Sequence, residues 1–84
     1  MLSFLSVPGA SKRALISPPS YYRLAADGLM PPVVKLAKSR SAVIEDELDA
    51  VLRARAIGMS NDDVRKLVKR MVEQRVEIFG GNAA

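Results

Sequence analysis

The chain has 84 residues, 49% of them hydrophobic, which allows one small domain with a single core. It contains no cysteine and no histidine, so disulfides, the usual zinc sites and the Ser–His and Cys–His pairs of nucleophilic enzymes are excluded. We therefore expect a protein that is not an enzyme and needs no cofactor. No apolar run is long enough to span a membrane, and the first residues lack the features of a signal peptide. We expect a cytoplasmic protein without a membrane partner.

The net charge of +4 is concentrated in the N-terminal half of the chain. Residues 1–41 carry six basic residues and one acidic residue, a net charge of +5, whereas residues 42–84 carry seven basic and eight acidic residues, a net charge of −1. This asymmetry favours one half that faces a polyanion and one half that forms a scaffold. A merely solvated basic surface is the alternative interpretation.

Two short helices are predicted in the first third of the chain. The first covers residues 6–15, with a serine as its N-cap and a proline in its first turn. The second covers residues 17–27, where Ser17 is a suitable N-cap and Pro18 occupies the first helical position. Gly28 ends this second helix, because glycine readily adopts the conformation that follows a helix terminus.

The second helix is predicted to have two different faces. Tyr21, Leu24 and Ala25 recur at three- and four-residue spacing and form an apolar face that we expect in the core. Ser20 and Arg23 lie on another face. That face is available to a ligand.

A β-hairpin is predicted over residues 33–44. Residues 33–36 and 42–44 are short apolar runs with strand character. The polar and basic residues 37–41 lie between the two runs and are predicted to form the turn, although no Asn-Gly type of turn signal is present.

Two further helices are predicted after the hairpin. Glu45, Asp46 and Glu47 place negative charge in the first turn of one helix, which suits the helix dipole. No complementary ligand set accompanies these acids, so we do not interpret them as a metal site. Gly58 ends this helix, and Ser60 caps the next one.

The last helix carries an apolar stripe with a near-heptad rhythm and is predicted to end at a pair of glycines, residues 80–81. Three interpretations of the stripe stay open: it completes the core, it pairs with a second copy of the chain, or it docks another protein. We expect part of it to cover the core and the rest to mediate self-association. The stripe consists of Val64, Leu67, Val68, Met71, Val72, Val76 and Phe79.

The predicted order is therefore helix, helix, hairpin, helix, helix. A helix pair followed by a two-stranded wing is typical of a winged helix-turn-helix. We expect a mainly α fold with a small β-hairpin, in which residues 1–57 form a winged helix-turn-helix DNA-binding domain. Residues 58–84 form an additional C-terminal helix for core completion or self-association.

These motifs, in this order, resemble those of the AlpA-like regulators of phages and integrative elements, a group close to excisionases and to MerR-type winged helices. The resemblance covers residues 4–57 and rests on the opening FLSVP, SPPSYYRL at residues 17–24, Gly28, PPVVKL at residues 31–36, Arg40 and EDELDA at residues 45–50. The chain departs from the family pattern at several positions, and the usual core residues of the first helix are reduced to Ala10 and Ala14. Leu15 stands where the turn between the first two helices usually holds a glycine, and Val43 stands where a tryptophan is usual. Pro18 and Pro19 stand where an arginine and a serine are often found.

The resemblance implies a DNA-binding protein of an integrated mobile element such as a prophage, associated with the bacterial nucleoid. Members of the group act in DNA recombination as recombination directionality factors (excisionases), or in transcription regulation as activators of integrase genes. We expect an excisionase that binds attachment-site DNA cooperatively and bends it. Its expected partners are double-stranded DNA, further copies of itself and a tyrosine or serine recombinase. An AlpA-like transcriptional regulator that works with RNA polymerase is the first alternative. A small protein-interaction module, such as an antitoxin or an adaptor, is the alternative from another class.

The predicted DNA-binding residues follow from the way such a fold meets a duplex. A short helix inserts its N-terminal end into the major groove, so residues off its core face reach bases or phosphates. A basic wing tip enters the minor groove, and Arg40 is favoured over Lys38 because a guanidinium loses its hydration more readily. The alternatives are an ordinary solvated helix face, a structural role for Tyr22 and a hairpin tip that is merely polar. The predicted contacts are Ser17, Pro19, Ser20, Tyr22 and Arg23 on the recognition helix, Lys35, Lys38, Ser39 and Arg40 on the wing, and Lys12 and Arg13 as phosphate contacts.

Overall fold

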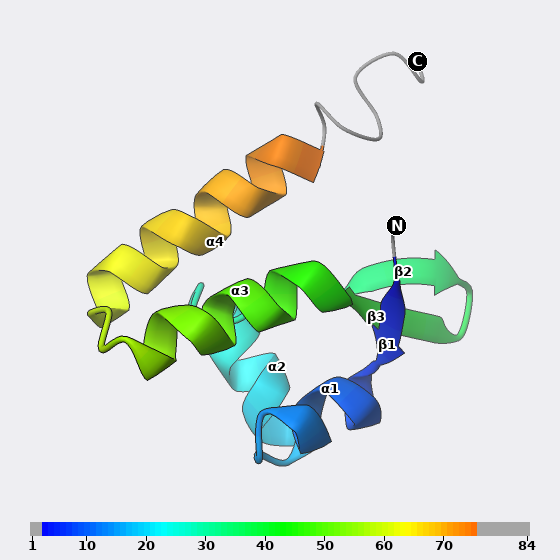
Figure 1. The fold of residues 1–84 in the computed structure, drawn as a ribbon. Helices are drawn as coiled ribbons and strands as arrows, with labels where there is room; N and C mark the ends of the chain where they lie inside the picture. The colour runs from blue at the N-terminus through cyan, green and yellow to red at the C-terminus, as the bar shows by residue number, and fades with distance from the viewer. Residues whose placement is uncertain (1–2, 76–84) are drawn as a thin grey trace.

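A computed structural model describes residues 3–75 of the chain, which form four helices and a three-stranded antiparallel sheet (Figure 1). The predicted mainly α fold with a small hairpin, a winged helix-turn-helix followed by an additional helix, is confirmed. None of the helices in this part of the chain is long and apolar enough to cross a lipid bilayer. The elements are β1 (Phe4–Ser6), α1 (Val7–Arg13), α2 (Pro18–Ala26), β2 (Val34–Ala37), β3 (Arg40–Ile44), α3 (Glu45–Ala56) and α4 (Asn61–Arg75).

Three helices begin at the serine caps that the sequence predicts. The Oγ atoms of Ser6, Ser17 and Ser60 each accept a hydrogen bond from the backbone N–H three residues later, at 3.0, 3.3 and 3.2 Å. This bond satisfies one of the N–H groups that a helix start leaves without a partner. Local sequence therefore determines where α1, α2 and α4 begin.

The first three helices end in the same hydrogen-bonded motif. After α1, the N–H of Ile16 donates a hydrogen bond of 3.0 Å to the carbonyl of Ser11. The residue just before this donor has a left-handed backbone conformation. That residue is Leu15 after α1, Gly28 after α2 and Gly58 after α3, with φ of 61°, 76° and 85°. Glycine tolerates this conformation, whereas leucine is strained in it. The turn between α1 and α2 is thus built like the other two, but from an unfavourable residue.

The sheet contains one strand that the sequence does not predict. The strand order is β1-β3-β2, and β1 pairs with β3 so that Leu5 lies opposite Val43. β1 has three residues, too few to show an alternating pattern. The hairpin turn is also tighter than predicted: the strands extend to Ala37 and from Arg40, so only two residues form the turn. A register shift between Lys35 and Ala37 places a bulge beside it.

The core lies around α3, which runs through the middle of the molecule with α4 on one side and α1 and α2 on the other (Figure 1). Side chains from α2, β3, α3 and α4 are fully buried there: Tyr21, Val43, Leu48, Val51 and Val64. The Tyr21 hydroxyl donates a hydrogen bond of 2.8 Å to the carbonyl of Pro31. The core position predicted for Tyr21 is confirmed, and burial raises the pKa of this phenol well above its ordinary value.

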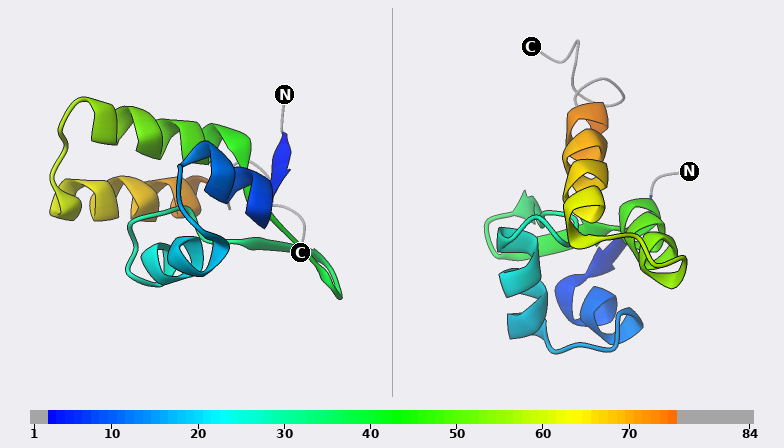
Figure 2. Two further views of the ribbon diagram at one scale, coloured as in Figure 1. Left: turned by 90° about the horizontal axis from the view of Figure 1, so that it is seen from below. Right: turned by 90° about the vertical axis from the view of Figure 1, so that its left-hand side faces the viewer.

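The apolar stripe of α4 is directed into the chain's own core. Val64 and Val68 are 0% and 4% exposed, and Leu67, Met71 and Val72 are partly buried against the same core. Figures 1 and 2 show α4 running back past α3, close to it at the connecting turn and diverging from it farther along. Val64 and Val68 therefore complete the core and are not available for the self-association predicted for them. The two other members of the predicted stripe, Val76 and Phe79, lie outside the described residues.

Candidate nucleic-acid interface

Helix α2, the predicted recognition helix, presents one face to solvent and one to the core. At 100° per residue, Pro19, Tyr22 and Arg23 fall on the same side of the helix, and all three are exposed. The two adjacent tyrosines separate accordingly, because Tyr22 is 50% exposed whereas Tyr21 is 0% exposed. The exposed face contains most of the residues that the sequence assigns to DNA contact from this helix.

The start of α2 carries a chain of polar side chains. Ser17 Oγ donates to Ser20 Oγ at 3.0 Å, and Arg23 Nη2 lies 3.4 Å from the same Ser20 oxygen. The contact orients the Arg23 side chain toward the N-terminal end of the helix. The guanidinium has five N–H donors, so this single long contact leaves it able to bind further acceptors.

The wing and helix α2 enclose a common hollow. Its volume is about 410 Å³, and it opens to solvent between α2, the N-terminal end of α1 and the hairpin. Tyr22 reaches it from α2, whereas Ser39 and Arg40 reach it from the wing. The structure thus brings together three predicted contact residues that lie up to 18 positions apart in the sequence. The complete lining is Ser6, Val7, Pro8, Tyr22, Ser39, Arg40 and Ser41.

The two remaining predicted wing contacts, Lys35 and Lys38, are exposed. Lys38 lies in the two-residue turn, and Lys35 lies opposite Ser41 in the register of β2 and β3. Directly opposed residues project from the same face of a sheet. Lys35 therefore projects from the same face of the sheet as Ser41, which lines the hollow.

The two basic residues of α1 differ in their surroundings. Lys12 is exposed. Arg13 Nη2 binds Glu45 Oε2 and Arg13 Nη1 binds Asp49 Oδ1, both at 2.9 Å, and these hydrogen bonds, the one to Asp49 first, raise the pKa of the Arg13 guanidinium. The side chain joins α1 to α3. A phosphate contact by Arg13 would have to compete with both carboxylates.

The acidic run at the start of α3 is divided between two arginines. Glu45 and Asp49 bind Arg13, while Glu47 binds Arg75 of α4. The other basic residues of the N-terminal half make no ion pair with any residue in 3–75, so their positive charge is not neutralised within that part of the chain. They are Lys12, Arg23, Lys35, Lys38 and Arg40.

Sequence reasoning missed the residues that β1 and α1 contribute to the hollow. Ser6, Val7 and Pro8 line it because β1 pairs with β3 and α1 follows β1 without a loop. The cap at Ser6 was predictable, but the pairing that carries it beside the wing has no local signal. Comparison with known protein families, curated proteins and solved structures yields no significant match to this chain.

Proposed function

We propose that this protein binds double-stranded DNA, with α2 in the major groove and the β2–β3 wing in the adjacent minor groove. The observation that carries the proposal is the hollow shared by Tyr22 of the recognition helix and Arg40 of the wing. Neighbouring grooves are separated by one sugar–phosphate strand. A protein that enters both must straddle this strand, and a hollow between the two inserted elements provides the space for it.

The chemistry of the hollow suits a phosphodiester. A guanidinium, serine hydroxyls and a phenol surround it, and such groups make most protein contacts to the DNA backbone. Arg23, on the same exposed face of α2 as Tyr22, supports base or phosphate recognition in the major groove. We assign Tyr22 and Arg40 to the phosphate strand and Arg23 to the major groove.

Within this class we propose an excisionase of an integrated mobile element, associated with the bacterial nucleoid, on the basis of the AlpA-like sequence pattern. Several copies would occupy neighbouring sites beside an attachment site and curve the DNA. Bending a short site costs on the order of a few kcal/mol, which protein–DNA and protein–protein contacts must offset. The tyrosine or serine recombinase then acts on the bent DNA.

Binding to a duplex that carries the attachment region tests the proposal. Arg23→Ala is expected to weaken binding roughly 5- to 150-fold, the range for one base-reading side chain. Arg40→Ala is expected to weaken binding and to reduce the slope of log K against log salt by about 1, because one phosphate contact is lost. Arg70→Ala removes the same charge from the exposed side of α4 and is the matched control. Equal effects of all three variants would contradict the assignment.

Excision of the resident element, measured with and without the gene, separates the proposed role from transcriptional regulation. An excisionase changes the yield of excised DNA when the recombinase is supplied from a constant promoter. A regulator changes promoter output and leaves excision unaltered under that condition.

A further inference from the structure

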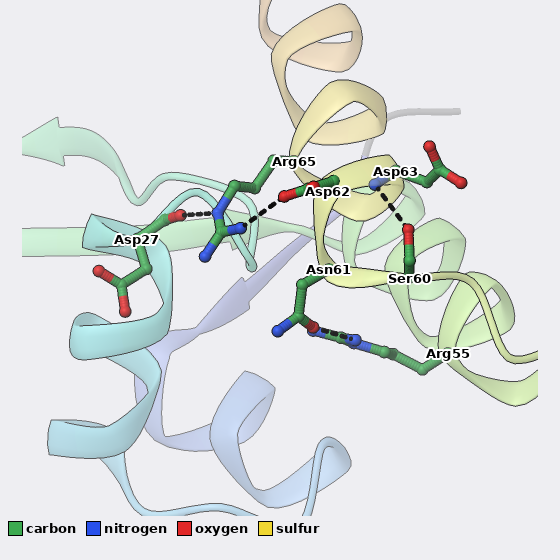
Figure 3. A network of polar contacts seen from close by, with 7 residues as sticks. All are labelled: Asp27, Arg55, Ser60, Asn61, Asp62, Asp63 and Arg65. Atoms are coloured by element: carbon green, nitrogen blue, oxygen red, sulfur yellow. Dashed lines mark hydrogen bonds and ion pairs between the residues drawn. The ribbon is translucent and has the colours of Figure 1, made fainter.

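Two arginines of α4 bind the loop that joins the recognition helix to the wing. This loop covers residues 27–33, between the last residue of α2 and the first residue of β2. Arg65 Nε donates to the carbonyl of Asp27 at 3.0 Å, as Figure 3 shows, and Arg75 Nη2 donates to the carbonyl of Pro32 at 3.0 Å. The two arginines therefore hold opposite ends of the same loop.

Each arginine is itself fixed by a carboxylate. Arg65 Nη1 binds Asp62 Oδ1 at 3.1 Å, one turn earlier on α4 (Figure 3). Arg75 Nε binds Glu47 Oε2 at 2.8 Å, and a second nitrogen of Arg75 binds the other oxygen of Glu47. This pairing with Glu47 raises the pKa of the Arg75 guanidinium. Glu47 is 8% exposed, so the pair is largely shielded from water and its geometry is well defined.

The two arginines lie far apart on α4. Arg65 and Arg75 are ten residues apart on the same helix, which corresponds to a distance of roughly 15 Å along the axis. A helix is stiffer than a loop, so it transmits this distance to the two carbonyls. Inside the loop, the hydroxyl of Tyr21 holds the carbonyl of Pro31 at 2.8 Å from the recognition helix.

We propose that α4 is a brace that sets the position of the wing relative to the recognition helix, with Arg65 and Arg75 as positioning residues for DNA binding. The proposal rests on the proposed function, because the two braced elements are those assigned to neighbouring grooves. A duplex offers these grooves at a fixed separation. If α2 and the wing already have that separation in the free protein, the protein loses less conformational freedom on binding.

The brace is distinct from the contribution of α4 to the core. Val64 and Val68 bury apolar surface, and they are left in place when either arginine is replaced. Arg65 keeps 45% of its side chain exposed, so Arg65→Gln is expected to fold. Arg75 is more buried and binds the carbonyl of Pro32, two residues before the wing strand β2, so its replacement is expected to have the larger effect.

The first test measures the geometry without DNA. The chain has no cysteine, so the substitutions Ala26→Cys and Ser39→Cys place one spin label at the end of α2 and one in the wing turn. We expect a narrow distribution of label-to-label distances, which broadens in Arg65→Gln and further in Arg75→Gln. Lys66→Gln and Arg70→Gln remove the same charge from exposed positions of α4 and should leave the distribution unchanged.

The second test measures binding to the attachment-region duplex. We expect Arg65→Gln and Arg75→Gln to weaken affinity on the order of tenfold at temperatures where both are fully folded, with the two control variants unchanged. Hydroxyl-radical footprints should lose protection at the wing-contacted minor groove while the major-groove protection persists. A role confined to stability would lower the melting temperature but leave the footprint of the folded protein intact.

The outcomes separate the brace from the proposed function. If the wild-type protein does not bind the duplex, DNA binding is wrong, and the spin-label distances alone decide whether α4 is a brace. If Arg23→Ala weakens binding while Arg65→Gln changes neither the distances nor the footprint, the brace is wrong and DNA binding stands. If Arg75→Gln does not fold, the comparison of Arg65→Gln with its control Lys66→Gln decides whether α4 is a brace.

Discussion

The backbone strain at Leu15 makes a quantitative prediction for stability. Leu15 has φ of 61°, and 91% of the residue's surface is exposed to solvent. Its backbone is therefore strained, and no burial of apolar surface compensates for the strain. The left-handed conformation costs a residue with a Cβ about 1–2 kcal/mol, and glycine avoids this cost. Glycine in turn loses more freedom on folding, by about 0.5–1 kcal/mol. We therefore expect Leu15→Gly to stabilise the protein by about 0.5–1 kcal/mol.

For a domain of this size, the gain corresponds to a rise in melting temperature of roughly 2–8 °C. Thermal and urea unfolding followed by far-ultraviolet circular dichroism measure it. Leu15→Ala is the matched control: it removes the exposed side chain but keeps the Cβ, so its stability should stay within about 0.5 kcal/mol of the wild type. If Leu15→Gly were no more stable than Leu15→Ala, strain would not be the reason and the argument would be refuted.

Three further changes test the contacts around α2 and α4. Ser17→Ala removes the N-cap of α2 and should lower the free energy of unfolding by about 1 kcal/mol in urea denaturation. Glu47→Gln leaves Arg75 without its counter-ion and should cost about 2 kcal/mol, less than for a fully buried pair because the Arg75 side chain keeps 19% exposure. Burial raises the pKa of Tyr21 in the folded state, so the unfolded chain releases the phenol proton at lower pH than the folded protein does. The contribution of the Tyr21 phenol to the free energy of unfolding is therefore complete below pH 10 and is lost as the pH rises further. The loss is expected to approach about 1.4 kcal/mol per pH unit in urea titrations at increasing pH.

Each of these changes has a control. Ser17→Asp keeps a capping oxygen and should retain most of the stability, so equal losses for both substitutions would contradict the capping argument. For Glu47, a double-mutant cycle with Arg75→Gln should give a coupling energy well above the error, and additive effects would mean that the pair is not coupled. Tyr21→Phe should lack the alkaline loss of stability, and an unchanged pH dependence in that variant would assign the loss to another group.

Helix boundaries were predictable because their causes are local. The serine caps and the glycines at positions 28 and 58 act within a few residues of themselves, so the pattern in the sequence is the cause of the structure. The hairpin was predictable from two apolar runs on either side of a basic turn. The strand β1 was not predictable in this way, because its three residues become a strand through pairing with β3, which is distant in the sequence.

The partners of the arginines could not be predicted for a different reason. Arg65 and Arg75 bind backbone carbonyls, and every residue has a carbonyl, so the acceptor leaves no trace in the sequence. Arg13 looked like a phosphate contact because it adjoins Lys12 in a basic half of the chain. Its partners are acids of α3 more than 30 positions away, which come into reach only when α1 packs beside α3.

Five of the eight arginines of this chain fall into two groups that differ in what they bind. Arg13, Arg65 and Arg75 each bind a carboxylate, and the last two also bind a carbonyl of the loop between α2 and β2. Arg23 and Arg40 make no ion pair within residues 3–75 and stay exposed. An arginine that already binds a carboxylate would lose that interaction on meeting a phosphate, whereas an exposed and unpaired one loses only water. Among the exposed arginines without an ion pair in residues 3–75, only Arg23 and Arg40 lie on α2 and the wing. A polyanion that binds these two elements is therefore expected to lie beside Arg23 and Arg40, while Arg13, Arg65 and Arg75 maintain the geometry of the surface on which these two lie.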